Sequence, residues 1–367
     1  MKMMAVGEPA PWFTAPTLDG NARFSFETTA GRPILLMMAG SLGWPACAQA
    51  LAKVRAHRPL FDDVRASFFG VSIDPADVSA RRIAKEIPGF RWFLDHDRRI
   101  STLFGVAHDD QGAVRYEPHF LLLDHRLRVA GVFRIADADA ALAAFRDLAA
   151  RGCEVRHAPV LIVPRVLEPE VCRHLIGLYD RHGGQQSGFM REEDGRTVGI
   201  LDHSFKRRAD HIIADEALQK ALSMRLSTRL LPEIRRAYAF AVTRIERWLV
   251  ACYDGEGGGY FKPHRDNRTG GTAHRRFACT INLNTEEYDG GELRFPEYGD
   301  TRYRAPTGGA VIFSCSLLHE AMPVTRGRRY AFLPFLYDEE AAEIRERNKH
   351  LIVDHTPAVA MPAVAAG

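Results

Sequence analysis

Short apolar runs alternate with helical patterns over residues 1 to about 150. PILLMMAG, at 33–40, and FFGVSID, at 68–74, predict two buried strands, and the periodicity at about 46–61 predicts a helix between them. A strand, a helix and a strand in this order imply a parallel pair joined by a crossover. The other elements expected here are a helix at about 79–86, two strands within 118–134 and a helix at 137–152. The first half is therefore predicted to be a small α/β sandwich.

A different pattern begins after RGCEVRHAP, at 151–159, which we interpret as a linker because it is polar and contains Gly and Pro. From about Arg244 onward, short apolar runs are broken by Gly and Asp, which is typical of an antiparallel double-sheet barrel. The elements expected before that point are a strand at 160–167, a helix from about Pro169 and a helix at about 214–229. We predict domains at 1–150 and 160–345 and a C-terminal tail at 346–367, whose last residues should be mobile.

Composition places the chain among globular proteins. Its 367 residues, 46% of them hydrophobic, are enough for two separate cores, and a formal net charge of +3 is too mild to imply a nucleic-acid partner. No signal-like segment or long apolar run is apparent, so we expect no membrane partner and a cytoplasmic location. The cysteines are scattered without C-x-x-C spacing, which favours reduced thiols over a disulfide framework or a zinc site. A homodimer is left open.

Polar residues in the barrel half form an ordered series. In GYFKPHRDN, His264 and Asp266 are two positions apart, so on a strand both side chains point to one face. His319 follows a later apolar run, and Arg329 lies on the next predicted strand. Two histidines and one carboxylate are the ligands of non-haem iron(II) sites, and a guanidinium suits the far carboxylate of a 2-oxo acid. An H-x-D pair alone also occurs by chance on surface strands, but the ordered series favours an iron and keto-acid site.

Residues 160–340 resemble the iron(II)- and 2-oxoglutarate-dependent oxygenases of the prolyl 4-hydroxylase type. The similarity runs from VLEPEVCRHLI through ACYDGEGGGYFKPHRD and DGGELRFPEYG to HEAMPVTRGRR, and VACYDGEGGGYFKPHRDN is similar in particular to the oxygen-sensing animal prolyl hydroxylases. The resemblance implies a double-stranded β-helix, or jelly roll, so that an α/β domain is followed by a β-rich α+β domain. It also implies Fe(2+) as cofactor, 2-oxoglutarate and O2 as co-substrates, and ascorbate as a further candidate cofactor.

The same resemblance implies roles for individual residues. The iron ligands would be His264, Asp266 and His319. Arg329 would hold the distal carboxylate of 2-oxoglutarate, and Tyr253 would donate a hydrogen bond to this co-substrate, the alternative being a half-buried core tyrosine. Where relatives place a tyrosine against the distal carboxylate, this chain offers Asn282, or Thr280 in a different register.

The first half resembles peroxiredoxins and thioredoxin-like proteins through VGEPAPWF, GRPILLMMAGSLGWPACAQALAKVRAHRPLF and EPHFLLLDHRLRV. Cys47 falls at the start of a predicted helix, where unpaired N–H groups favour a thiolate, and where the family has its peroxidatic cysteine. However, Gly40 and Trp44 replace the proline and threonine of the family pattern, and Glu117 stands in place of an arginine. We therefore expect a degenerate or auxiliary domain. Pro118 is a candidate cis proline.

These observations predict a dioxygenase that hydroxylates an unactivated C–H bond in a prolyl or other peptide residue, an amino acid or a small metabolite. The alternatives are a thiol peroxidase that uses Cys47 and a redox-regulated binding protein. The basic clusters FKRRADH, at 205–211, and HRRF, at 274–277, would favour an acidic substrate if they border the pocket, and would otherwise form a solvated charged face. REEDGR, at 191–196, is either a mobile loop over the site or an exposed turn.

Overall fold

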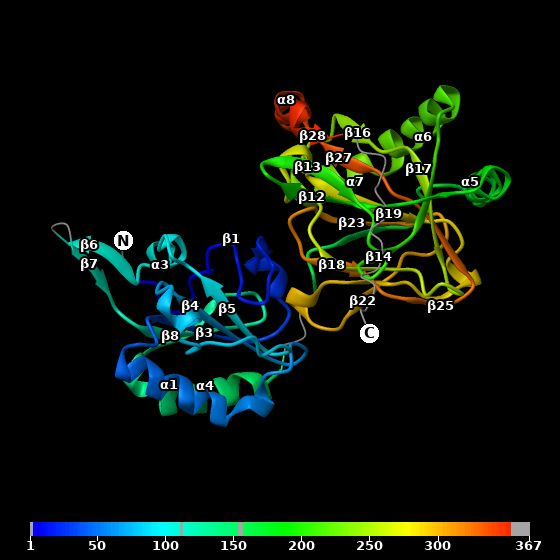
Figure 1. Ribbon diagram of the computed structural model, residues 1–367. Coiled ribbons are helices and arrows are strands. Elements are labelled where there is room, and N and C mark those ends of the chain that lie inside the picture. The colour runs from blue at the N-terminus through cyan, green and yellow to red at the C-terminus, as the bar shows by residue number, and fades with distance from the viewer. Residues whose placement is uncertain (1–2, 111–112, 153–156, 354–367) are drawn as a thin grey trace, which may run out of the picture. The chain divides into compact units, whose positions relative to one another are not determined.

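The computed structural model describes residues 3–110, 113–152 and 157–353 (Figure 1). They form two compact units that divide near residue 157, except that Pro296–Gly299 group with the first unit. The predicted linker at 151–159 includes residues 153–156, which lie outside the described residues. Within the described ranges, no helix combines the length and the apolar character needed to cross a membrane.

The first unit is built on a five-stranded sheet with the strand order β5–β4–β3–β8–β9. The strands are β3 (Ile34–Gly40), β4 (Ser67–Ser72), β5 (Phe90–Leu94), β8 (His119–Leu123) and β9 (Val129–Arg134). The first three are parallel, and β8 and β9 are antiparallel to their neighbours. The predicted crossover pair and the strands within 118–134 are confirmed, and the strand order is that of a thioredoxin fold.

Helices α1 (Pro45–Ala56) and α4 (Ala138–Ala150) lie side by side against one face of this sheet (Figure 1). Pro45 begins α1, where its missing N–H has no helical partner to lose. The helix buries one face at spacings of three and four residues, through Cys47, Ala50, Leu51 and Val54. These side chains share a core with Leu35, Met37 and Phe120 of the sheet and Leu142 and Phe145 of α4.

The helix predicted at about 79–86 is wrong. The chain forms a single helical turn, α2 (Ala76–Ser79), and Arg81 then takes a φ of 53°, a left-handed conformation that ends a helix. The buried carboxylate of Asp77 accepts hydrogen bonds from the backbone N–H of Leu42 at 3.0 Å and from the hydroxyl of Ser72 at 2.6 Å. Contacts distant in sequence therefore decide the conformation of this segment.

The remaining elements of the first unit are α3 (Arg99–Leu103), β1 (Thr14–Ala15), β2 (Phe24–Ser25), β6 (Ala107–Asp110) and β7 (Ala113–Tyr116). The peptide bond before Pro118 is trans, contrary to the proposed cis proline. Among the described residues, the cis peptide bond precedes Pro88.

The second unit contains two sheets that line one cavity. The larger sheet has the order β10–β23–β19–β26–β17–β15–β11, with β27 paired to β19 and to β16. Its strands are β10 (Leu161–Val163), β11 (Gln185–Gln186), β15 (Ala209–Ile212), β16 (Arg244–Glu246), β17 (Leu249–Asp254), β19 (Phe277–Asn282), β23 (Ala310–Ser314), β26 (Arg328–Phe332) and β27 (Phe335–Tyr337). The smaller sheet, in the order β14–β18–β24–β21–β22, consists of β14 (Lys206–Arg207), β18 (Tyr260–His264), β24 (His319–Ala321), β21 (Leu293–Arg294) and β22 (Arg302–Tyr303). Residue pairing between the strands is antiparallel, as predicted for a jelly roll.

Three helices share a core with the larger sheet, namely α5 (Pro169–His182), α6 (Glu216–Arg229) and α7 (Leu231–Tyr238). A fourth, α8 (Glu339–Asn348), contacts the short 3-10 turn Gly270–Thr272. Pro169 begins α5, as predicted, and Asp215 caps α6 by accepting from the N–H groups of Ala217 and Leu218. Helix α7 was not predicted. It starts anew at Leu231 because Pro232 suits the first turn of a helix better than the interior of a longer one.

The segment REEDGR forms the turn of an antiparallel hairpin between β12 (Phe189–Glu193) and β13 (Arg196–Ile200). Asp194 and Gly195 both have positive φ, as tight hairpin turns require. β13 also pairs in parallel with β28 (Ile352–Val353), so the second unit extends to the end of the described chain. The predicted domain end at 345 falls inside α8, and the part of the predicted tail at 354–367 lies outside the described residues. The last pair is β20 (Asp289–Gly290) with β25 (Val324–Arg326).

Candidate metal centre

Neighbouring strands of the smaller sheet bring two histidines together. β18 and β24 are antiparallel, with His264 directly opposite His319, and the centres of the two rings are 4.3 Å apart. β18 ends at His264, and Asp266 lies in the turn that follows, where its backbone N–H donates to the carbonyl of Cys315 at 3.0 Å. A turn, rather than the pleat of one strand as predicted, therefore brings Asp266 to the histidines.

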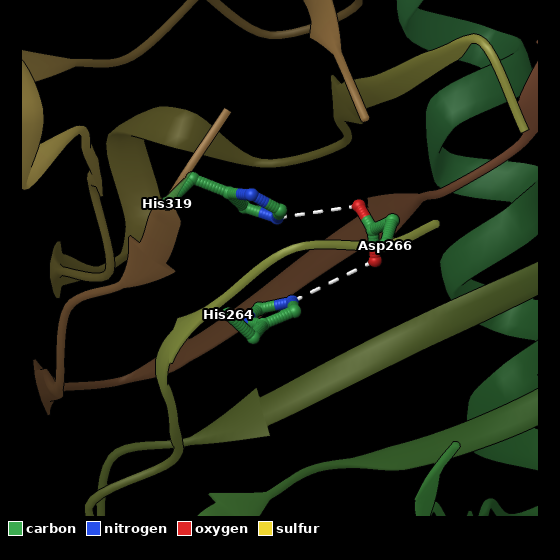
Figure 2. Close-up of side chains that lie close together, drawn as sticks. All are labelled: His264, Asp266 and His319. Atoms are coloured by element: carbon green, nitrogen blue, oxygen red, sulfur yellow. Dashed lines mark ion pairs between the residues drawn. The ribbon is translucent and has the colours of Figure 1, made fainter. Parts of the chain in front are cut away.

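All three side chains converge on one point (Figure 2). Nε2 of His264 lies 3.7 Å from one carboxylate oxygen of Asp266, and Nε2 of His319 lies 3.3 Å from the other. One candidate ligand atom from each residue lies within 4.8 Å of the others. Atoms that bind one ion at about 2.1 Å stand roughly 3 Å apart in octahedral geometry, so small side-chain adjustments would close the set around a metal.

Hydrogen bonds to the backbone define which ring nitrogens face Asp266. Nδ1 of His264 lies 2.7 Å from the carbonyl of Lys262, and Nδ1 of His319 lies 3.0 Å from the carbonyl of Leu317. Because a carbonyl can only accept, each Nδ1 carries a proton. Burial, followed by the nearby His319, lowers the pKa of His264 to about 3, so its Nε2 has a free lone pair at neutral pH.

The third group of the set is an anion. Burial alone would raise the pKa of Asp266, but the two histidines lower it below its ordinary value, and the group is a carboxylate at neutral pH. Two imidazole nitrogens and one carboxylate, all on one side of a common point, fit an iron(II) ion with open positions on its other side. The side chains of His264, Asp266 and His319 are no more than 14% exposed.

Arg329 reaches the same cavity from the larger sheet. It lies on β26 opposite Tyr253 of β17, with its guanidinium carbon 4.8 Å from the centre of the tyrosine ring. The residue is 2% exposed, its Nε has no hydrogen-bond partner, and in the described part of the chain its guanidinium makes no ion pair. A buried guanidinium without a counter-charge is costly, so this position suits an anionic ligand.

The predicted co-substrate residues divide into two groups. Thr280 and Tyr253 line the cavity, whereas Asn282 does not. The Asn282 amide is instead turned to the backbone, where it donates to the carbonyl of Ala305 at 2.8 Å. Of the two alternatives for the second carboxylate contact, the structure therefore brings Thr280 into the site.

The basic clusters at 205–211 and 274–277 are largely buried. For three of their basic residues, the interpretation as a solvated face is therefore wrong. Lys206, Arg208 and Arg275 are each less than a tenth exposed. Arg208 lines the cavity, donates to the hydroxyl of Tyr253 at 3.4 Å and pairs with Asp210 at 2.7 Å. Arg275 approaches the turn that carries Asp266, and one of its nitrogens lies 3.5 Å from the backbone carbonyl of Asp266.

Arg247 also lines this cavity, although it was not among the predicted site residues. It stands between β16 and β17, directly before the apolar run WLVACY. A charged residue at the entry of a buried strand is the one signal in the sequence that could have identified it.

In the first unit, Cys47 occupies the predicted place near the start of α1 but is only 1% exposed. Burial, and after it the carboxylate of Asp77, raises the pKa of the Cys47 thiol to about 11. Burial and the nearby anion thus act against the thiolate that the helix terminus was expected to favour. Asp77 is itself fixed by Arg82, whose guanidinium lies 3.1 Å away.

Comparison with known families agrees with this division. Residues 248–337 match the 2OG-Fe(II) oxygenase superfamily, and residues 6–132 match the AhpC/TSA family. The first segment contains the three converging ligands and Arg329, and the second contains Cys47. The two predicted resemblances and the fold class are confirmed. The oxygenase family implies iron(II), 2-oxoglutarate and O2, with a small-molecule or peptide substrate.

Individual relatives cover parts of the chain. A PKHD-type hydroxylase from Synechococcus sp. (strain JA-2-3B'a(2-13)) is 35% identical over 89 residues, which are 23% of this chain and 39% of that protein. A PKHD-type hydroxylase from Hyphomonas neptunium (strain ATCC 15444) is 29% identical over 154 residues, which are 40% of this chain and 67% of that protein. The chain thus spans less than half the length of the Synechococcus relative.

Solved structures resemble each unit separately. A prolyl hydroxylase from Trichoplax adhaerens, in complex with a hypoxia inducible factor peptide fragment, is 17% identical with a TM-score of 0.41, and the match covers 51% of this chain and 86% of that one. Peroxidoxin BcpB from Mycobacterium tuberculosis is 22% identical with a TM-score of 0.34, and the match covers 40% of this chain and 98% of that one.

Proposed function

We propose that the second unit is an iron(II)- and 2-oxoglutarate-dependent dioxygenase that hydroxylates an unactivated C–H bond. The observation that carries this proposal is the convergence of His264, Asp266 and His319 in a cavity that also holds the unpartnered guanidinium of Arg329. Three ligands on one side of an ion leave positions for a co-substrate and dioxygen. The buried guanidinium would bind the second carboxylate of the co-substrate.

Each residue of the site has a role in this proposal. His264 and His319 would bind iron through Nε2, oriented by the hydrogen bonds that their Nδ1 atoms donate to backbone carbonyls. The hydroxyls of Thr280 and Tyr253 would add hydrogen bonds to 2-oxoglutarate. Bound iron and 2-oxoglutarate would together supply the oxidation of the C–H bond by dioxygen. The buried position of the ligands would keep bulk water away from the reacting groups.

We also propose that the first unit has an auxiliary role and does not turn over peroxide. A thiol with a pKa of about 11 is almost entirely protonated at neutral pH, and the nucleophile of a thiol peroxidase is the thiolate. This disfavours the alternative in which Cys47 is the catalytic group. Three hypotheses stay predictions: a role as a redox-regulated binding protein, ascorbate as a further cofactor, and a homodimer.

Formation of succinate from 2-oxoglutarate tests the function directly. The iron-loaded full chain is screened against amino acids, small metabolites and proline-containing peptides, with dioxygen present. We expect a substrate to stimulate succinate formation in the wild type and the stimulation to disappear in His264→Ala. A substrate-stimulated conversion that persists in His264→Ala would contradict the proposed iron site.

Co-substrate binding provides a second, independent measurement. Arg329→Gln should raise the dissociation constant for 2-oxoglutarate roughly 100-fold, since two charge-assisted hydrogen bonds are lost, while iron remains bound. Arg328→Gln is the matched control, because Arg328 is the preceding residue on β26 and its exposed side chain pairs with Asp254. Equal affinities in the two variants would refute the role of Arg329.

A further inference from the structure

Arg247 has an unusual backbone conformation for a residue with a side chain. Its φ is 71°, in the left-handed region that such residues seldom adopt outside functional or tightly constrained positions. This conformation, at the junction of β16 and β17, accompanies a side chain that lines the cavity of His264 and Asp266. The side chain as a whole is 26% exposed.

Among the described residues, the guanidinium of Arg247 forms no ion pair that it does not share with another cation. The nearest is Asp210, 3.4 Å away, but Asp210 already pairs with Arg208 at 2.7 Å. Glu246, the preceding residue, is held by Arg275 at 2.7 Å. Arg247 thus shares Asp210 with Arg208 and with the buried Lys206, while Glu246 is engaged by Arg275 and His274, so Arg247 is able to take a further anion.

Arg247 and Arg329 approach the cavity from different places along β17. Arg329 lies opposite Tyr253, near the end of this strand, whereas Arg247 precedes its start. The guanidinium of Arg247 contacts Asp210 and the ring of Phe335, whereas that of Arg329 lies over the ring of Tyr253. A 2-oxoglutarate held at Arg329 would leave Arg247 for a second ligand.

The surroundings of Arg247 suit a substrate with both polar and apolar parts. The ring of Phe335 lies 5.4 Å from its guanidinium carbon, and Leu333, Pro334 and Phe313 line the same cavity. A charge beside apolar walls strengthens an ion pair relative to one in water. The site therefore combines one anion-binding group with a hydrocarbon surface.

We propose that Arg247 binds a carboxylate of the substrate and so determines specificity. The substrate would be a carboxylic acid, or a peptide that presents a side-chain carboxylate, near the C–H bond that is hydroxylated. This inference rests on the proposed function, because it assigns Arg329 to 2-oxoglutarate and Arg247 to the substrate.

Matched pairs of acids and amides test the inference. One set consists of free amino acids and their primary amides, and the other of proline-containing peptides with Glu or Asp and the same peptides with Gln or Asn. Binding is measured by calorimetry on the iron-loaded full chain with 2-oxoglutarate and without oxygen, and succinate formation is measured separately with oxygen. In the wild type we expect the acid to bind about tenfold to a hundredfold better than its amide in at least one set.

Variants assign this preference to one side chain. Arg247→Gln should reduce the difference between acid and amide to about twofold, and Arg247→Lys should retain part of it because the charge remains. Arg244→Gln is the control, since Arg244 lies on β16 with an exposed side chain paired with Glu339, outside the cavity. A preference among free amino acids would indicate a small-molecule substrate, and one confined to the peptides would indicate a peptide substrate.

Three results would overturn the inference. The first is an absence of any acid preference in the wild type, and the second is a preference that Arg247→Gln leaves unchanged. The third is a loss of 2-oxoglutarate affinity in Arg247→Gln equal to that in Arg329→Gln, which would assign Arg247 to the co-substrate. Failure of the iron-loaded wild type to bind 2-oxoglutarate would be a different outcome, because it would refute the proposed function itself.

Discussion

The thiol of Cys47 should react slowly with alkylating reagents at neutral pH. An ordinary thiol with a pKa near 8.5 is about 3% thiolate at pH 7. With a pKa of about 11, Cys47 has a thiolate fraction roughly 300-fold smaller. A more basic thiolate is also more nucleophilic, which offsets about a factor of ten. The net expectation is a rate roughly 30-fold below that of a free thiol, and lower still because the residue is 1% exposed.

Alkylation by iodoacetamide, followed by mass spectrometry of the peptide that contains Cys47, measures this rate. The same peptide in the urea-unfolded chain provides the reference for an ordinary thiol. Asp77→Asn should speed the reaction of the folded protein, because it removes the anion that opposes the thiolate. Asp139→Asn is the control, since Asp139 is an exposed acid that pairs with Lys53 on the surface of the same unit.

An alkylation rate at pH 7 equal to that of the unfolded chain would refute this reasoning. So would a stoichiometric reaction with hydrogen peroxide that disappears in Cys47→Ser, because it would require a reactive thiolate in the folded protein. Either result would favour the hypothesis that the first unit is a thiol peroxidase that uses Cys47. The expected result, slow alkylation in the wild type and faster alkylation in Asp77→Asn, would support an auxiliary domain.

Three further predictions concern the second unit. Burial would raise the pKa of Asp210, but Arg208 and other nearby cations lower it to about 2. This carboxylate therefore stabilises the fold above about pH 4 and loses that contribution as the pH falls toward about 2. Urea unfolding of Asp210→Asn should accordingly show a weaker dependence on pH across that range than the wild type, and an equal dependence would contradict the assignment. Gly308→Ala should lower the free energy of unfolding by about 2 kcal/mol or more, because Gly308 has a φ of 75° and an added Cβ would lie 2.2 Å from the carbonyl oxygen of Leu167. Urea unfolding measures this change, and a value below about 0.5 kcal/mol would show that the backbone relaxes. Added iron(II), without oxygen, should raise the midpoint of thermal unfolding of the wild type and leave the midpoint of His319→Ala unchanged, as measured by calorimetry. Equal shifts in the two proteins would show that the metal binds elsewhere.

The three ligands could be named from the sequence because an H-x-D pair and a later histidine match the pattern of a known oxygenase family. The sequence did not show that His264 and His319 stand directly opposite each other on β18 and β24. The choice between Thr280 and Asn282 could not be made in the same way. Both are on β19 two positions apart, and only the hydrogen bond between Asn282 and Ala305 explains why one side chain leaves the cavity.

Contacts between distant segments account for most of what the sequence did not predict. Helical periodicity at 79–86 was outweighed by the bonds that Asp77 makes to Leu42, in the turn after β3, and to Ser72 at the end of β4. Arg247 is a similar case, since its place in the cavity depends on a left-handed backbone angle that no sequence pattern around it signals. At such positions tertiary structure outweighs local conformational preference, and one of them, Arg247, is also a candidate binding residue.

Burial acts on ionisable groups in both units, but its consequence depends on whether the group can give up its charge. A thiol avoids the cost of a buried charge by keeping its proton, and Cys47 does so, which leaves a neutral and unreactive side chain. A guanidinium does not lose its proton in the physiological range, so Arg329 stays charged in the cavity and requires an anion. The buried thiol of Cys47 therefore needs no ligand, whereas the buried guanidinium of Arg329 does. This difference is a physical reason to place the chemistry of the chain in its second half.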